Sequence, residues 1–187
     1  MRIIVLMGAL LLAACSSAPP KLESYLLRPA VAPGAVTAVE DSGYALGTIR
    51  VANYIDQPGL VLTSGDGKVH AARNHVWAEP LQVSLRRFLA TQVSAGSDRD
   101  IAATATASTN TRINVSVDEL HGNDSGAAVL VAYWDVVAGE GSKSFRFSEE
   151  QALGSDGYDA LVQAEEALLE RLADAIAASL PAATPRN

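Results

Sequence analysis

Three consecutive segments in the second half of the chain carry the pattern of an antiparallel sheet. Apolar and polar residues alternate well in residues 112–120 and again in residues 144–148. Residues 127–137, between them, are apolar on both sides, which is typical of a strand in the interior of a sheet. Short glycine-containing turns separate the three runs. The pattern therefore predicts a three-stranded meander.

Two longer segments have the periodicity of amphipathic helices. The first covers residues 79–94, with Pro80 in its first turn, where the missing backbone N–H costs no hydrogen bond. The second follows Ser155, which we expect to cap it, and ends before Pro181. The apolar positions of the second helix are Tyr158, Leu161, Val162, Leu168, Leu169, Leu172, Ile176 and Leu180.

Shorter strand signals precede the first helix, at residues 25–27, 44–55, 60–63 and 68–71. The Ala/Thr/Ser-rich residues 102–111 are compatible with one more strand. The order is then strands, helix, meander, helix. It predicts an α/β fold: a two-layer sandwich of a mostly antiparallel or mixed sheet, with two amphipathic helices on one face.

The start of the chain has the pattern of an export signal. Arg2 precedes an apolar run at residues 3–14, which is shorter than the roughly 20 residues that a membrane-spanning helix needs. Cys15, the only cysteine, follows small residues directly. A cysteine in this place receives a diacylglyceryl group through its sulfur. We therefore predict a lipoprotein signal over residues 1–14.

This signal sets the expected domain organisation. Residues 15–24 would form a lipidated tether, residues 25–181 one folded domain, and residues 182–187 a C-terminal tail. Ser16, directly after the cysteine, favours sorting to the outer membrane, on its periplasmic face. No cofactor is expected apart from the covalent acyl chains on Cys15.

Composition and motifs argue against several classes of function. The net charge of −7 at pH 7 disfavours a nucleic-acid-binding protein. We find no phosphate-binding loop, dinucleotide fingerprint or Gly-x-Ser-x-Gly elbow, so no catalytic residues are predicted. His70, His75 and His121 are expected in solvated turns rather than in a metal site.

Four segments together suggest a family. They are Tyr25-Leu26-Leu27, residues 49–58 with the turn Tyr54-Ile55-Asp56-Gln57-Pro58, Trp77-Ala78-Glu79-Pro80-Leu81, and residues 158–177. In this order they resemble the PqiC family, also called ABC-type transport auxiliary lipoproteins. One departure follows Leu60-Val61, where the family often has a Thr-Arg pair and this chain has Leu62-Thr63-Ser64.

The resemblance implies a role rather than a reaction. Members look like outer-membrane-anchored partners of MCE-domain systems, in which an inner-membrane permease and a tunnel-forming MCE protein carry lipid across the periplasm. It implies an accessory docking subunit that is not an enzyme, with the MCE tunnel protein as partner and the permease as indirect partner. Because such tunnels are cyclic, a homo-oligomer is a further expectation. The alternative hypothesis is a carrier that binds lipid inside its own fold, and a periplasmic hydrolase is disfavoured.

Two groups of residues are candidates for function. The partner-docking candidates are Tyr54, Asp56, Pro58, Arg86 and Arg87. A rigid proline turn that presents an aromatic residue suits a docking loop, although Tyr54 is equally compatible with burial. Arginines on or near the exposed side of the first helix suit acidic groups on a partner or lipid phosphate, although a solvated helix face explains them as well.

The second group, Trp77, Glu79, Pro80 and Leu81, is interpreted mainly as structural. Trp77 would pack ahead of the first helix, and Glu79 would favour the positive end of that helix. Trp134, on the predicted central strand, is expected in the core.

Overall fold

The structure, a computed structural model, describes residues 21–29 and 42–181. The predicted signal, Cys15 and the C-terminal tail lie outside the described residues. The strands are β1 (Glu23–Tyr25), β2 (Tyr44–Val51), β3 (Gly59–Thr63), β4 (Val69–Trp77), β5 (Ile101–Ala102), β6 (Thr111–Gly122), β7 (Ala127–Ala138) and β8 (Gly141–Ala152). The helices are α2 (Leu81–Ser97) and α3 (Tyr158–Ser179). None of the described helices is long and apolar enough to cross a membrane.

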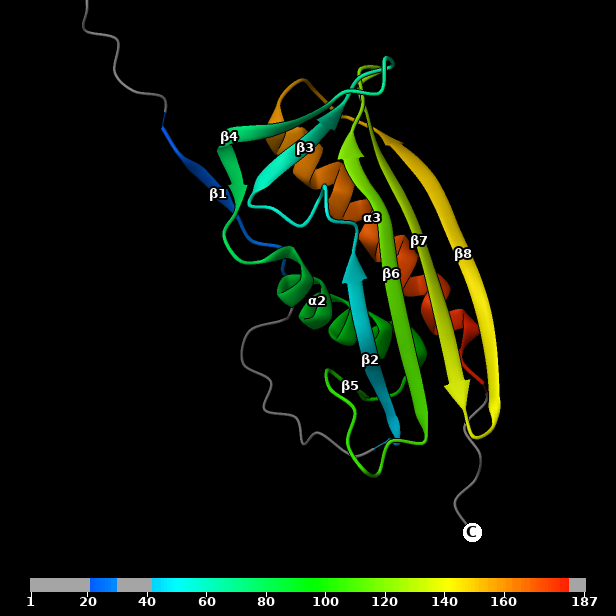
Figure 1. Cartoon of the computed structure of the whole chain (residues 1–187). Helices are drawn as coiled ribbons and strands as arrows, with labels where there is room; N and C mark the ends of the chain where they lie inside the picture. Colours follow the sequence, from blue (N-terminus) through cyan, green and yellow to red (C-terminus); the bar gives the residue numbers. More distant parts are fainter. Residues whose placement is uncertain (1–20, 30–41, 182–187) are drawn as a thin grey trace, which may run out of the picture.

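The predicted meander is confirmed. β6, β7 and β8 are long antiparallel neighbours on one side of the sheet (Figure 1), and β7 pairs with β8 over its whole length. From Thr111 to Val117 every second residue of β6 is buried, as the alternation predicts. After the register shift between Val117 and Glu119, the last three residues of the strand are all buried. Trp134 of β7 is buried and stacks on Phe145, with ring centroids 5.1 Å apart, so its expected place in the core is also confirmed.

The other side of β6 is shared by two strands that follow one another in the chain. β2 runs parallel to the first half of β6, and β3 meets its end, where Leu62 pairs with Gly122. The Tyr54–Pro58 turn connects β2 to β3, and β3 then forms a hairpin with β4 around the turn Ser64-Gly65-Asp66-Gly67. β1 is added to β4 as a parallel edge strand.

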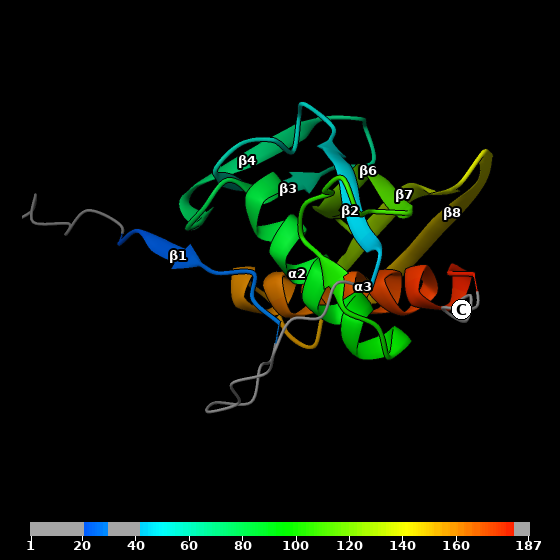
Figure 2. The same cartoon turned by 90° about the horizontal axis from the view of Figure 1, so that it is seen from below.

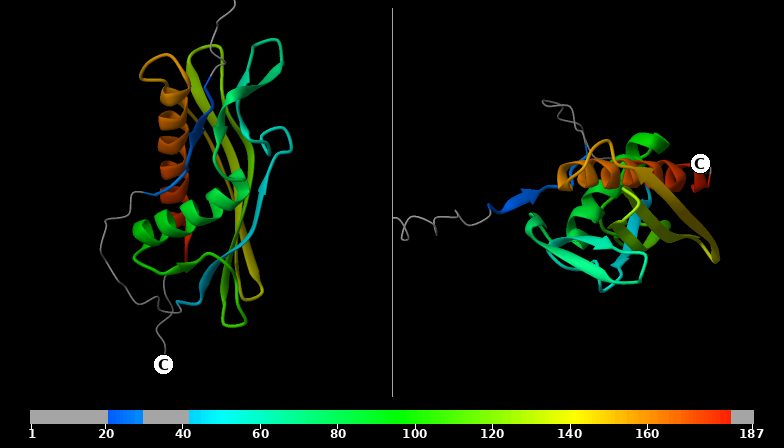
Figure 3. Two further views of the ribbon diagram at one scale, coloured as in Figure 1. Left: turned by 90° about the vertical axis from the view of Figure 1, so that its left-hand side faces the viewer. Right: turned by 90° about the horizontal axis from the view of Figure 1, so that it is seen from above.

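Both helices pack on one face of this mixed sheet, which confirms the predicted α/β class. The sheet is not flat but curls around α2 into a half-barrel (Figure 2), and α2 crosses α3 (Figure 3). The layer between helices and sheet is filled by fully buried apolar side chains. The largest are Phe88, Leu46, Ile49, Ile55, Leu60, Leu85, Leu89, Ile113, Leu130, Leu161, Leu168 and Leu169.

Two local predictions are wrong. Residues 102–111 do not form a strand of their own: Ala102 ends β5, Thr111 opens β6, and the chain between them turns at Thr106–Thr109. Ser155 does not cap the last helix: α3 begins at Tyr158 after Gly157, and no side chain caps it. Gly157 has a φ of 109°, a conformation that favours glycine and separates Ser155 from the helix.

Candidate functional site

Two of the sequence motifs meet at one surface depression. Residues 56–58 and 77–81 line a groove of about 270 Å³, which we call the motif groove. A backbone hydrogen bond joins its two sides, since the N–H of Trp77 donates to the carbonyl of Pro58 at 2.7 Å. Segments that are separated in the sequence thus form one surface.

The backbone around the motif groove is closely fitted. Gly59 opens β3 where the hairpin partner passes very near, and a Cβ there would stand 2.3 Å from the carbonyl oxygen of Ala72. The turn before it is closed by the N–H groups of Ile55 and Asp56, which donate to the carbonyl of Ala52 at 3.0 and 3.1 Å. These contacts hold the turn in one conformation beside the end of β4.

Tyr54 does not line the groove. Its ring is half-buried and lies 6.3 Å from the ring of His121. Burial, with smaller contributions from Glu119 and Asp118, raises the pKa of its phenol to about 12. Asp56 and Pro58, in contrast, are exposed at the groove. Of the three turn candidates, the structure therefore places two at the groove surface.

Glu79 links the groove to a cluster of charge beside it. Its carboxylate contacts the guanidinium of Arg87, lies 3.8 Å from that of Arg28, and accepts a hydrogen bond from Ser84 Oγ at 3.3 Å. Two arginines thus share one carboxylate, so a net positive charge remains. Trp77 is buried and Pro80 immediately precedes α2, positions that suit the structural roles interpreted for this motif.

Arg86 is not on the exposed side of the helix, where we had expected it. Its Nη1 donates to the backbone carbonyls of Gly47 at 2.9 Å and of Ala103 at 2.8 Å. Gln82, one turn earlier, donates to the carbonyl of Ile49. Because these bonds attach α2 to β2 and to the loop after β5, we leave Arg86 out of the candidate docking surface.

The expectation of solvated turn histidines is also wrong. His121 is buried in β6, with Nε2 3.2 Å from Glu119 and Nδ1 3.2 Å from Thr63. His75, in β4, stacks on Tyr158 at 4.2 Å. Only His70 is exposed, and it lies in β4. Within residues 21–29 and 42–181, no three metal-ligating side chains of His, Cys, Asp or Glu gather into a possible site.

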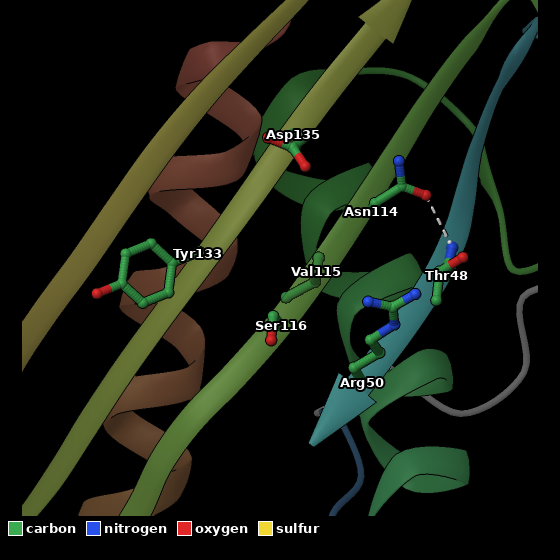
Figure 4. A pocket seen from close by; sticks show the side chains of 7 residues that line it. All are labelled: Thr48, Arg50, Asn114, Val115, Ser116, Tyr133 and Asp135. Atoms are coloured by element: carbon green, nitrogen blue, oxygen red, sulfur yellow. Dashed lines mark hydrogen bonds between the residues drawn. The ribbon is translucent and has the colours of Figure 1, made fainter. Parts of the chain in front are cut away.

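A second depression, of about 250 Å³, lies on the sheet face that the helices do not cover (Figure 4). It is lined by Thr48, Arg50, Asn114, Val115, Ser116, Tyr133 and Asp135. Asn114 Oδ1 accepts a hydrogen bond from the Thr48 N–H at 2.9 Å and fills the space beside Gly47. The polar half of the alternation in residues 112–120 is the sequence signal for this face, but it did not indicate a hollow.

One buried ionisable residue gave no sequence signal. Glu165, on the apolar seam of α3, is 1 % exposed, and its Oε2 has no hydrogen-bond partner among the described residues. Burial, reinforced by the charge of Glu166, raises the pKa of Glu165 to about 8. A neutral carboxyl in the core offers no binding chemistry at the surface.

Comparison with known proteins agrees with the motifs. The chain is 29% identical over 164 residues to the intermembrane transport lipoprotein PqiC of Escherichia coli (strain K12), covering 86% of this chain and 87% of that protein. The PqiC of Shigella flexneri matches with the same values.

Solved structures show the same fold. A crystal structure of an uncharacterized protein matches with a TM-score of 0.76 and 23% identity, covering 87% of this chain and 100% of that one. A crystal structure of a protein from Xanthomonas campestris matches with a TM-score of 0.56 and 17% identity, covering 71% and 80%. The family model for the ABC-type transport auxiliary lipoprotein component matches residues 25–177, nearly all of the predicted domain. The chain therefore belongs to the family of ABC-type transport auxiliary lipoproteins, as the motifs suggested.

Proposed function

We propose that this protein is a non-enzymatic accessory subunit of an MCE-type intermembrane lipid transport system. Acyl chains on Cys15 would hold it at the periplasmic face of the outer membrane, and the motif groove would dock the MCE tunnel protein. The observation that carries the proposal is the convergence of the two motifs on that groove. The name of the E. coli relative, an intermembrane transport lipoprotein, supports the same role.

The chemistry of the groove suits a protein partner. Pro58, Trp77 and Pro80 supply apolar lining, and Asp56 places an exposed carboxylate beside it, whereas the carboxylate of Glu79 is already paired with Arg87 and Arg28. An apolar side chain next to a basic residue on a partner loop complements this arrangement. The hydrogen-bonded turn is already ordered, so little conformational entropy is lost on binding.

The alternative, a lipid carrier, has less support. The acyl chains of a carried lipid would need room between the helices and the sheet. Fully buried side chains such as Phe88, Leu130 and Leu168 occupy that layer. We therefore assign lipid passage to the partner tunnel and docking to this chain.

Site-specific crosslinking in cells tests the docking proposal. A photoreactive amino acid at Asp56 should capture the MCE protein, because the residue is exposed at the groove. The same amino acid at Val69, exposed in β4 near the β3–β4 turn, is the matched control and should capture little of it. Equal capture at both positions, or none at Asp56 in cells that contain the complete system, would refute docking at the groove.

The anchor has its own test. Cys15→Ala removes the only thiol that can carry the acyl chains, so the protein should leave the membrane fraction while its folded domain stays intact. Fractionation with circular dichroism measures both. A Cys15→Ala protein that remains in the outer membrane would disprove the anchor.

A further inference from the structure

Exposed apolar side chains gather where the chain enters the fold. Among the described residues, the large apolar side chains that remain exposed are Leu22 (58%), Leu26 (46%), Val69 (47%), Val83 (50%) and Tyr133 (42%). Leu22 and Leu26 flank β1, and their even spacing puts them on one side of the extended segment. The opposite side faces the fold, where Tyr25 binds His75 and Asp159 and Leu27 is buried.

The first helix continues this surface. Arg28 and Arg87 line one depression, so the segment after β1 lies beside the outer side of α2. Val83 precedes Arg87 by one helical turn and therefore shares its side of the helix. The resulting set, which we call the entry patch, is Lys21, Leu22, Leu26, Arg28, Val83 and Arg87.

The charges of the entry patch differ from those of the whole protein. The chain carries a net charge of −7, but the patch holds three cations. Lys21 pairs with Glu23 at 3.0 Å, while Arg28 and Arg87 share the single carboxylate of Glu79. Leucines beside an excess of positive charge are typical of surfaces that rest on phospholipid headgroups.

The short tether between Cys15 and the entry patch indicates that the patch contacts a membrane. Leu22 is seven residues after Cys15 (22 − 15 = 7), and seven fully extended residues span at most about 25 Å. A lipidated Cys15 therefore keeps Leu22 within that distance of the membrane interface at all times. The tether gives the bilayer a high effective concentration at the patch, so the patch contacts the bilayer more readily than a freely diffusing partner.

We propose that the entry patch lies on the membrane that holds the Cys15 anchor, with Leu22 and Leu26 inserted among the lipid headgroups. This inference rests on the proposed anchor and goes beyond it, since it gives the domain one fixed orientation. Glu79 belongs to the motif groove and to the ion pairs of Arg28 and Arg87. The groove would therefore open beside the bilayer, where a tunnel delivering lipid must end.

Fluorescence quenching by lipid tests the orientation. The full lipidated protein is reconstituted into vesicles of phosphatidylethanolamine and phosphatidylglycerol, with or without bromine on the acyl chains. Leu26→Trp reports on the patch and Val69→Trp is the matched control, since the two positions are equally exposed. Trp77 and Trp134 are buried and provide a constant background that the unsubstituted protein measures.

We expect brominated lipid to quench the Leu26→Trp signal at least about twofold more than the Val69→Trp signal. Leu22→Trp, on the same side of the segment, should be quenched like Leu26→Trp. Agreement between the two variants shows that the quenching does not come from a distortion at one position. Equal quenching at the patch and at Val69, in protein that floats with the vesicles, overturns the entry patch alone. Protein that does not float at all overturns the anchor, and the patch with it. Concentration-dependent shielding of the Leu26→Trp signal without lipid quenching would instead show a second copy of the chain on the patch.

Discussion

The sheet has two parts that are assembled in different ways: the meander side, with β6–β8, and the N-terminal side, with β1–β4. The meander side pairs strands that follow one another, and β7 and β8 match without a register shift. On the other side, β1 pairs with β4 across some fifty residues, and Tyr25 donates to Asp159 at 2.7 Å across 134 residues. Local pairing makes a regular scaffold, whereas the distant pairing brings motifs together at a surface. The motif groove and the entry patch both lie on the second side.

We expect the largest loss of stability for a substitution in the scaffold, the meander β6–β8. Leu130→Ala empties a fully buried position of β7 and should lower the free energy of unfolding by about 2–5 kcal/mol. Urea denaturation measures it. Val69→Ala, at an exposed position of β4, should change it by less than about 0.5 kcal/mol. If the two losses were similar, the scaffold would not be the stable part of the fold.

The buried carboxyl of α3 predicts a pH dependence. The pKa of Glu165 rises from an ordinary 4.5 to about 8 in the folded state, so between these values the folded protein binds more protons than the unfolded one. Stability should therefore fall as pH rises from about 4.5 to 8. Glu165→Gln should remove most of this slope and stabilise the protein by on the order of 3 kcal/mol at pH 8. A smaller slope of the same sign should remain, because burial and the charge of Glu170 also raise the pKa of Glu166. Thermal unfolding at several pH values measures it.

The control for Glu165 is Glu150→Gln, at an exposed position of β8. It should leave the slope between pH 5 and 8 unchanged. A slope that survives Glu165→Gln undiminished would assign the pH dependence to another group.

The pairing of β2 with β6 connects the two sides, and its register shifts between Leu46 and Ile49. Gly47, inside this shift, tests how closely the two strands fit. A Cβ at Gly47 would stand 2.2 Å from Asn114 Oδ1, so Gly47→Ala should cost about 1–3 kcal/mol. In an Asn114→Ala background the same change should cost clearly less, because the clashing atom is gone. A double-mutant cycle by urea denaturation gives the coupling. Strictly additive costs would mean that the backbone, not Asn114, requires glycine here.

The smallest effect is expected at β1. Tyr25→Phe removes the hydrogen bonds to Asp159 and His75 and should cost about 0.5–1.5 kcal/mol. Hydrogen exchange should show faster exchange at the amides of β1 and β4, with the β6–β8 amides unchanged. Faster exchange throughout the sheet would mean that the two sides unfold as one unit.

The scaffold was also the part that the sequence predicted best. Alternation in β6 and the apolar seam of α3 are local patterns, and they indicate which residues are buried before any partner is known. On the N-terminal side the sequence shows short motifs rather than a regular alternation of apolar and polar residues. Its strands were found, but the meeting of residues 56–58 with residues 77–81 depends on β4 returning beside β3.

The residues misplaced from the sequence share one physical cause. Arg86 and His121 are polar, and a local pattern assigns polar residues to solvent. Each is instead covered by segments distant in the chain, as when β2 and the loop after β5 receive the guanidinium of Arg86. Only tertiary structure distinguishes such residues from a solvated helix face.

The central place of β6 has a consequence for the order of folding. β2 and β3 precede β6 in the chain, yet both complete their sheet pairing on it. A protein chain is synthesised from its N-terminus, so β2 and β3 cannot complete their pairing until β6, about 60 residues later, is available. Loop-closure entropy slows this distant pairing further. We expect pulse-labelled hydrogen exchange to find β6–β8 protected before β2 and β3. Until then the chain would need shielding from aggregation, and simultaneous protection of all five strands would remove that requirement.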